Sequence, residues 1–185
     1  MTTVASPTTS QFEHGLRRLY YARFGFAIVW AALLFLSSSD LNPVSVVLLV
    51  LYPAFDVAAA VVDLRSSHAA EQARGLYVNI AVSALAAVGI ALACTSDVST
   101  VLRVWGAWAV VSGLVQLSVG IARRTLGGQW PMILSGGLSV LVGVGFILAA
   151  GADDPSLAGL AGYAALGGVF FLISALRLGR VAQES

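Results

Sequence analysis

The sequence predicts an all-α integral membrane protein with six transmembrane helices, arranged as three tandem two-helix hairpin repeats. Composition is the first observation: 58% of the 185 residues are apolar and 10% are charged, against about 25% charged in a soluble domain. The mean hydropathy is +0.89 and the net charge is +1. These values exclude a soluble globular domain and the basic surface that a nucleic-acid-binding protein needs.

The second observation is a set of six apolar stretches, each close to the roughly 20 residues that cross a bilayer as a helix. They lack the alternation of polar and apolar residues that membrane barrel strands show. In chain order they cover residues 19–36, 44–62, 76–94, 101–121, 130–150 and 157–176.

Each stretch is bounded by features that place its ends. The first is longer than the roughly 7–15 apolar residues of a signal-peptide core, so we expect a retained span there. The second contains Pro53, which leaves the carbonyl of Leu49 without its helical donor and favours a kink. The later stretches end where the chain turns polar, and these polar breaks are residues 37–40, 65–74, 95–97, 123–124 and 153–155.

The arginines predict the orientation of the chain. All ten basic residues are arginines, and nine of them fall on one side of the membrane if both termini share that side. These nine are Arg17, Arg18, Arg23, Arg65, Arg74, Arg123, Arg124, Arg177 and Arg180. The other side carries Arg103 and four aspartates, among them Asp40 and Asp97. The positive-inside rule therefore predicts a multi-pass protein of the bacterial inner membrane with both termini cytoplasmic.

The third observation is an internal repeat with a period of about 56 residues. A shift by this period aligns Ser83 with Ser139, and polar loop residues keep the same register, as Asp97 and Asp153 show. We therefore expect a polar N-terminal segment, a membrane domain of three repeats and a short tail. Their predicted bounds are 1–18, 19–178 with repeats at about 19–74, 75–129 and 130–180, and 179–185.

Small residues recur at every fourth position in the first helix of repeats two and three, which lets helix backbones approach closely. The candidate packing residues are Ser83, Ala87, Ser135, Ser139 and Gly143. The matching positions of the first repeat include the bulky Phe26 and Trp30, so we expect the aromatic side of that helix to face lipid or a partner. The tryptophans 105, 108 and 130 lie near helix ends, where aromatic belts form.

The three hairpins, and the glycine-rich segment Ser-Gly-Gly-Leu-Ser-Val-Leu-Val-Gly-Val-Gly at residues 135–145, resemble the HdeD-like short-repeat membrane proteins. The resemblance extends from residue 16 to residue 180 and is clearest at 127–177. It implies an association with acid resistance in enteric bacteria. The family supplies no catalytic residues to carry over.

Ionisable and polar residues inside a span are costly and indicate a functional site. The candidates lie in one depth zone, and they are Asp56, Arg23, Asp63, Asn79 and Gln116. Three interpretations stay open for Asp56: a proton or ion relay toward Asp63, an ion pair with Arg23, and burial as a neutral acid or an oligomer contact.

The sequence contains no enzyme motif such as HExxH, CxxC or GxSxG, so we expect no catalytic activity. Cys94 is the single cysteine, and His14 and His68 lie outside the apolar stretches, so we expect no metal site and no cofactor. The expected partner is the lipid bilayer, with other membrane proteins or self-association left open. The favoured function is stress- or envelope-associated action through such contacts, and the alternative is a small transporter or proton conductor that uses Asp56.

Overall fold

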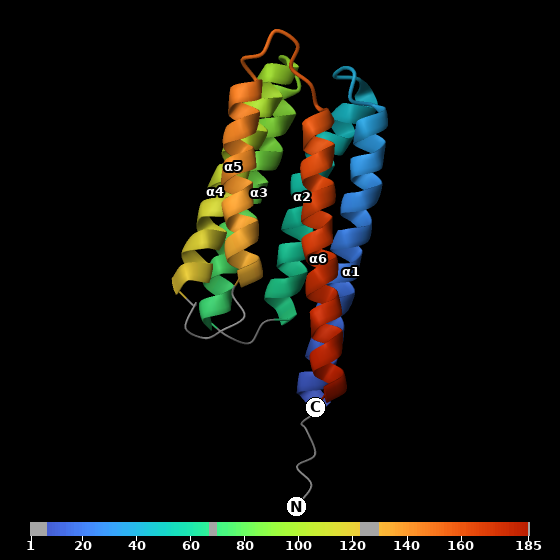
Figure 1. Cartoon of the computed structure of the whole chain (residues 1–185), viewed down its shortest axis with the longest axis vertical. Coiled ribbons are helices and arrows are strands. Elements are labelled where there is room, and N and C mark those ends of the chain that lie inside the picture. Colours follow the sequence, from blue (N-terminus) through green and yellow to red (C-terminus); the bar gives the residue numbers. More distant parts are fainter. Residues whose placement is uncertain (1–6, 67–69, 123–129, 185) are drawn as a thin grey trace, which may run out of the picture.

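The protein is a bundle of six long α-helices, seen here in a computed structural model that describes residues 7–66, 70–122 and 130–184 (Figure 1). The helices are α1 (Pro7–Leu36), α2 (Pro43–Ser66), α3 (Ala70–Ala93), α4 (Val98–Ala122), α5 (Trp130–Ala149) and α6 (Ala158–Glu184). Each contains a segment long and apolar enough to cross a membrane. The prediction of an all-α protein with six spans is confirmed.

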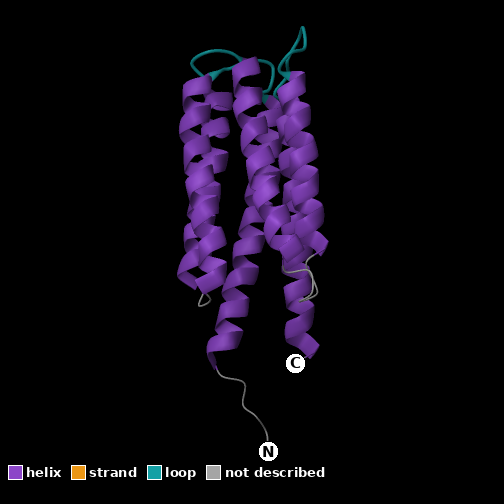
Figure 2. Ribbon diagram, turned by 90° about the vertical axis from the view of Figure 1, so that its left-hand side faces the viewer, coloured by secondary structure: helices purple, strands orange, loops and turns teal. Residues whose placement is uncertain are grey.

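The two ends of the bundle differ in what they carry. The turns at 37–42, 94–97 and 150–157 lie together at one end, which we call the far end (Figure 2). The described ends of α1 and α6 lie at the opposite end, which we call the terminal end (Figure 1). The predicted links that contain His68 and the pair Arg123–Arg124 lie outside the described residues.

Side-chain caps start the helices that descend from the far end. At α2, the Oδ1 atom of Asn42 accepts hydrogen bonds from the amides of Val44 and Ser45, both at 3.0 Å. The hydroxyl of Ser45 accepts the amide of Asn42 in return, at 2.9 Å, which is the reciprocal arrangement of a capping box. Pro43 occupies the first helical position, where a missing N–H costs nothing.

The helices form a closed ring in chain order, with α6 returning to α1. The most extensive contacts join α4 to α5, α1 to α6 and α2 to α3, which are pairs from neighbouring hairpins. The contacts within one hairpin are less extensive; these pairs are α1 with α2, α3 with α4, and α5 with α6. This alternation of large and small contacts around the ring is the pattern that a threefold internal repeat produces.

Glycines give α4 and α5 their close approach. A Cβ atom built on Gly143 would lie 2.7 Å from the carbonyl oxygen of Gly106, and one on Gly113 would lie 2.6 Å from that of Gly136. Both separations are shorter than real Cβ contacts allow. Gly106 and Gly113 are seven residues apart, as are Gly136 and Gly143, so they recur along one side of each helix.

The far half of the bundle is solidly packed. Its core includes Leu34, Leu49 and Ile90, each 0% exposed, and the aromatic pair Trp30 and Trp105. The outer surface, in contrast, is covered by aliphatic side chains, of which Leu85, Leu141 and Leu148 are each 73% exposed. The repeat is visible here too, because Leu85 and Leu141 occupy equivalent positions.

The expectation that the aromatic side of the first helix faces outward is wrong. Trp30 is 2% exposed, stacks on Trp105 with 5.5 Å between ring centroids, and donates its indole N–H to the carbonyl oxygen of Leu48 at 2.6 Å. A buried indole N–H usually finds such an acceptor. Pro53 within α2 has no N–H to offer to the carbonyl of Leu49, one residue beyond Leu48. Trp105 is likewise interior at 0% exposure, whereas Trp130 is 71% exposed.

Candidate functional site

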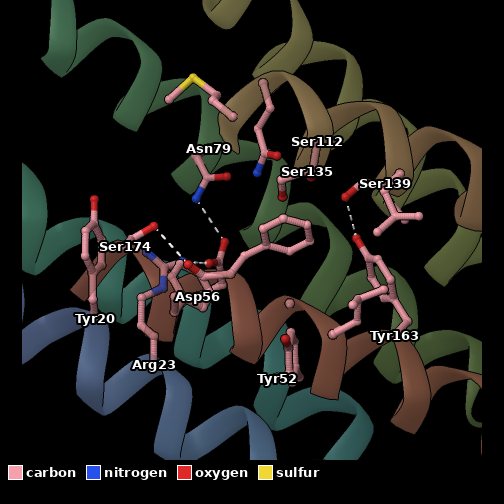
Figure 3. Close-up of a pocket in the computed structure, with 18 of the residues that line it drawn as sticks. Tyr20, Arg23, Tyr52, Asp56, Asn79, Ser112, Ser135, Ser139, Tyr163 and Ser174 are labelled. Atoms are coloured by element: carbon pink, nitrogen blue, oxygen red, sulfur yellow. Dashed lines mark hydrogen bonds and ion pairs between the residues drawn. The ribbon is translucent and has the colours of Figure 1, made fainter. Parts of the chain in front are cut away.

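A cavity of about 480 Å³ occupies the terminal half of the bundle, and all six helices contribute to its wall. Figure 3 shows the polar side chains around it, which come from all six helices. The cavity begins where the packed core of the far half ends.

Asp56 on α2 is the centre of the polar network in this cavity. Its Oδ1 atom forms an ion pair with the Nη2 atom of Arg23 on α1. Its Oδ2 atom accepts hydrogen bonds from Asn79 Nδ2 at 2.9 Å and from Ser83 Oγ at 2.8 Å, both on α3. The carboxylate therefore links three helices, with one donor on one oxygen and two on the other.

The groups around Asp56 are held by further contacts. The indole N–H of Trp108 on α4 donates to Ser83 Oγ at 3.2 Å, and Ser83 is 0% exposed. The guanidinium of Arg23 also lies over the ring of Phe171 on α6, 4.4 Å from its centroid, in a cation–π contact. The side chains of Arg23 and Asp56 are 14% and 18% exposed, so the pair is largely shielded.

Each hairpin makes an equivalent contact at the level where the cavity begins. In the second hairpin Trp108 bonds Ser83, and in the third the hydroxyl of Tyr163 donates to Ser139 Oγ at 2.8 Å. In the first hairpin Phe26 replaces the serine and packs against Tyr52, 5.7 Å between centroids. Tyr52, Trp108 and Tyr163 thus form a ring of aromatic side chains at the far limit of the cavity.

The aromatic ring continues into the core of the far half. Tyr52 packs 4.6 Å from Trp30 and 5.7 Å from Trp105, measured between centroids. Trp105 in turn meets Trp108 edge to face at 5.3 Å. These contacts close the cavity on its far side with large apolar groups.

Polar atoms without partners lie on the wall opposite Arg23. Ser112 and Gln116, one turn apart on α4, both line the cavity. Within the described part of the chain, the buried atoms Ser112 Oγ and Gln116 Oε1 have no hydrogen-bond partner. Ser112 stands one repeat period after Asp56, so the second hairpin places a neutral hydroxyl where the first places a charge.

The structure brings together four of the five predicted polar residues. Arg23, Asp56, Asn79 and Gln116 line the cavity, and the first three are in direct contact. Asp63 lies two turns further along α2 and is 9% exposed, outside the described cavity wall.

The candidate packing residues lie in four different settings. Ser83 and Ser139 are buried and bond to aromatic side chains across their own hairpins. Ser135 lines the cavity, and Ala87 is half-buried on α3. Gly143 lies against the backbone of α4.

Sequence reasoning missed Tyr52, Ser112, Tyr163 and Phe171 as cavity residues. For the first three a signal exists, because Tyr52, Trp108 and Tyr163 recur at almost the repeat period and Ser112 follows Asp56 by the same period. For Phe171 there is none, since an aromatic residue in an apolar helix does not reveal which way it points. Across the described ranges, no three His, Cys, Asp or Glu side chains gather as metal ligands would.

No protein-family model, curated protein or solved structure matches this chain. The chain is a multi-pass membrane protein by its six spans.

Proposed function

We propose that this chain is an HdeD-like protein of the bacterial inner membrane, associated with stress or with the cell envelope, that acts through contacts with lipids or other membrane proteins and without catalysis. Two features support the assignment. One is the glycine-rich segment at 135–145 within three tandem hairpins, and the other is the ring in which neighbouring hairpins pack closely on one another.

The orientation is part of the proposal. Arg17, Arg65, Arg74 and Arg177 lie at the terminal end, and Asp40, Asp97 and Asp153 lie on the far-end turns. By the positive-inside rule, the terminal end faces the cytoplasm.

The observation that carries the proposal is that both oxygens of the Asp56 carboxylate already accept hydrogen bonds from other helices. Arg23, Asn79 and Ser83 donate to its two oxygens. A proton arriving at this carboxylate would have to displace one of these donors and leave Arg23 as an uncompensated, largely buried charge. Such a group joins helices well but exchanges protons poorly, so we assign Asp56 to holding the bundle together.

The packed far half supports the same conclusion. A proton path needs polar side chains or water along the bundle axis, whereas the axis beyond Tyr52 is filled by Trp30, Trp105, Leu34 and Leu49. The cavity therefore serves one side of the membrane only.

The experiment that tests the proposal is a proton-flux measurement in proteoliposomes with a pH-sensitive dye inside and a pH step outside. We expect the native protein and the Asp56→Asn variant to give the same flux as empty liposomes. Native flux that disappears in Asp56→Asn would overturn the proposal and make the protein a proton conductor.

The folding control uses the same two proteins in detergent. Asp56→Asn leaves Arg23 without its counter-ion, so we expect it to lower the free energy of unfolding by on the order of 3 kcal/mol. Joining Asp56→Asn with Arg23→Gln should recover part of that loss, because the unpaired charge is then removed.

A further inference from the structure

The cavity wall presents more hydrogen-bond donors than acceptors. Its described charged side chains are Arg23, Arg177 and Asp56, which leaves one net positive charge. Asp56 already accepts from three donors, while Asp56 is the one hydrogen-bond partner that the described residues offer to Arg23. A guanidinium has five N–H donors, so Arg23 retains donors for a ligand.

The opposite wall adds unsatisfied neutral groups. Ser112 and Gln116 line the cavity, and the buried atoms Ser112 Oγ and Gln116 Oε1 lack partners among the described residues. An unpaired buried hydroxyl costs free energy that a ligand recovers when it accepts a hydrogen bond from Ser112. Ser135 on α5 lies on the same side of the cavity (Figure 3).

The remaining wall is apolar and aromatic. Leu138, Leu166, Phe170 and Phe171 line the cavity on α5 and α6. The volume of about 480 Å³ falls within the range of roughly 300–1,000 Å³ that small-molecule sites occupy. A ligand that complements this wall has a polar, acceptor-rich end and an apolar body.

We propose that the cavity binds a small amphipathic organic anion of the aromatic carboxylate class. The carboxylate lies between Arg23 and Ser112, where it accepts hydrogen bonds from the guanidinium on one wall and from the hydroxyl on the other. The ring lies against Phe170 and Phe171. A cation of the same shape is disfavoured because it meets Arg23 and Arg177 while the oxygens of Asp56 are already occupied.

The structure also indicates a route by which the ligand enters the cavity, between α5 and α6. Met132 on α5 and Leu166 on α6 line the cavity and are 39% and 41% exposed. The contacts between α5 and α6 are the smallest around the ring, and those described near the far end involve Phe146 and Tyr163. An amphipathic anion dissolved in the membrane can therefore enter between these two helices.

The test is calorimetric titration of the full chain in phosphatidylcholine nanodiscs with 2-naphthoate, compared with 2-naphthylmethylammonium of the same shape. We expect saturable binding of the naphthoate above that of empty nanodiscs and no saturable binding of the cation. Because this comparison uses the native protein, it does not depend on any variant folding. Absence of saturable naphthoate binding, or equal binding of the cation, would overturn the proposal.

Two matched variants locate the site. Ser112→Val removes the hydroxyl that faces the cavity, and we expect naphthoate affinity to fall about tenfold. Ser118→Val changes the same residue type on the same helix at an exposed position, where the hydroxyl bonds the carbonyl of Leu114 at 2.8 Å, and affinity should not change. Equal affinity in the two variants would place the ligand elsewhere and refute the proposed site.

A third variant tests the charge at the cavity mouth. Arg177→Gln should weaken naphthoate binding and reduce its dependence on salt, because the attraction of an exposed charge is screened by ions. An unchanged affinity and salt dependence would contradict the role given to Arg177.

This inference goes beyond the proposed function, because contacts with lipids or other membrane proteins require no ligand in the cavity. The two fail separately. If the protein neither binds naphthoate nor conducts protons, the ligand proposal is wrong and the proposed function stands. Proton flux that is lost in Asp56→Asn removes the proposed function, whatever the titration shows.

Discussion

At the scale of single residues, two aspartates show two ways in which a carboxylate holds this bundle together, one among the helices and one on a turn. Asp56 shows the first case, because every donor that reaches it comes from another helix. Asp97 shows the second, because it lies on the far-end turn before α4 and its Oδ1 atom accepts the amide of Thr100 at 2.6 Å. Both carboxylates hold elements in place, but of the two only Asp97 lies on an exposed turn.

Asp97 predicts a pH-dependent contribution to stability. The backbone hydrogen bond from Thr100 is the main cause that lowers the pKa of Asp97, with the hydroxyl of Thr100 adding to it. A carboxyl whose folded pKa lies below its unfolded value stabilises the fold at pH above the unfolded pKa, and that stability is lost as the pH falls through the folded pKa. We therefore expect the native protein to be more stable than Asp97→Ala at about pH 7 and this advantage to shrink below about pH 4.

Thermal unfolding of both proteins in detergent across this pH range measures the effect. Asp154→Ala is the matched control, since Asp154 is also an exposed aspartate on a far-end turn. A constant difference between the native protein and Asp97→Ala down to strong acid would contradict the capping role.

At the scale of helices, the closest contacts are made by backbones and not by large side chains. Helices in lipid gain little from burying apolar surface against each other, so small residues that allow close approach decide which faces pack. The α4–α5 pair illustrates this, with Gly106 against Gly143 and Gly113 against Gly136. The other glycines of α5 show that the residue type alone does not define the interface, because Gly137 and Gly145 have nothing near their Cβ positions.

Two glycines on α5 therefore predict opposite results from one added methyl group. Gly143→Ala puts a Cβ atom 2.7 Å from the carbonyl oxygen of Gly106, which forces α4 and α5 apart. We expect a loss of about 1–3 kcal/mol in the free energy of unfolding, the typical cost of overpacking. Gly145→Ala meets open space and should be neutral or gain up to about 1 kcal/mol from helix propensity.

Unfolding by a denaturing detergent, titrated into micelles that contain each variant, compares the two. Equal stability of Gly143→Ala and Gly145→Ala would show that the α4–α5 contact does not depend on backbone approach.

At the scale of the whole molecule, the bundle is packed in its far half and hollow in its terminal half. The buried aromatic and aliphatic core lies toward the turns at 37–42, 94–97 and 150–157, and the cavity lies toward the termini. The two sides of the membrane are therefore not equivalent for any ligand, and the orientation decides which compartment the cavity serves.

Cysteine labelling tests that orientation. In a Cys94→Ser background, Thr95→Cys places a thiol on an exposed far-end turn and Gly15→Cys places one at the terminal end, where its Cβ meets open space. We expect a membrane-impermeant maleimide to label Thr95→Cys in intact cells and Gly15→Cys only after permeabilisation. Cys94 itself is a poor probe, because burial raises the pKa of its thiol and lowers the thiolate fraction.

The reverse labelling pattern would place the cavity on the outer side of the membrane and contradict the positive-inside assignment. Labelling of both positions in intact cells would show that the reagent has crossed the membrane, which a cysteine-free variant and a known cytoplasmic marker protein check.

The spans and their number were readable from the sequence alone. The bilayer core has no water to pair with backbone groups, so a helical crossing segment must be long and apolar. The repeat was readable as well, since polar turn residues such as Asp97 and Asp153 keep its register. The grouping of Arg23, Asp56 and Asn79 was also readable, since ionisable and polar groups inside a span pair with one another.

The tertiary structure alone decided which faces of the helices turn inward. An apolar or aromatic residue packs about equally well against lipid and against a neighbouring helix. The sequence pattern therefore does not show which side of a helix faces inward. Trp30 was expected to face outward and lies in the core, and Gly143 and Gly145 look alike in the sequence but only one meets a neighbour. The cavity, with Ser112 and Gln116 facing Arg23 across it, exists because helices from three hairpins close into a ring, and that closure is a property of the assembled bundle.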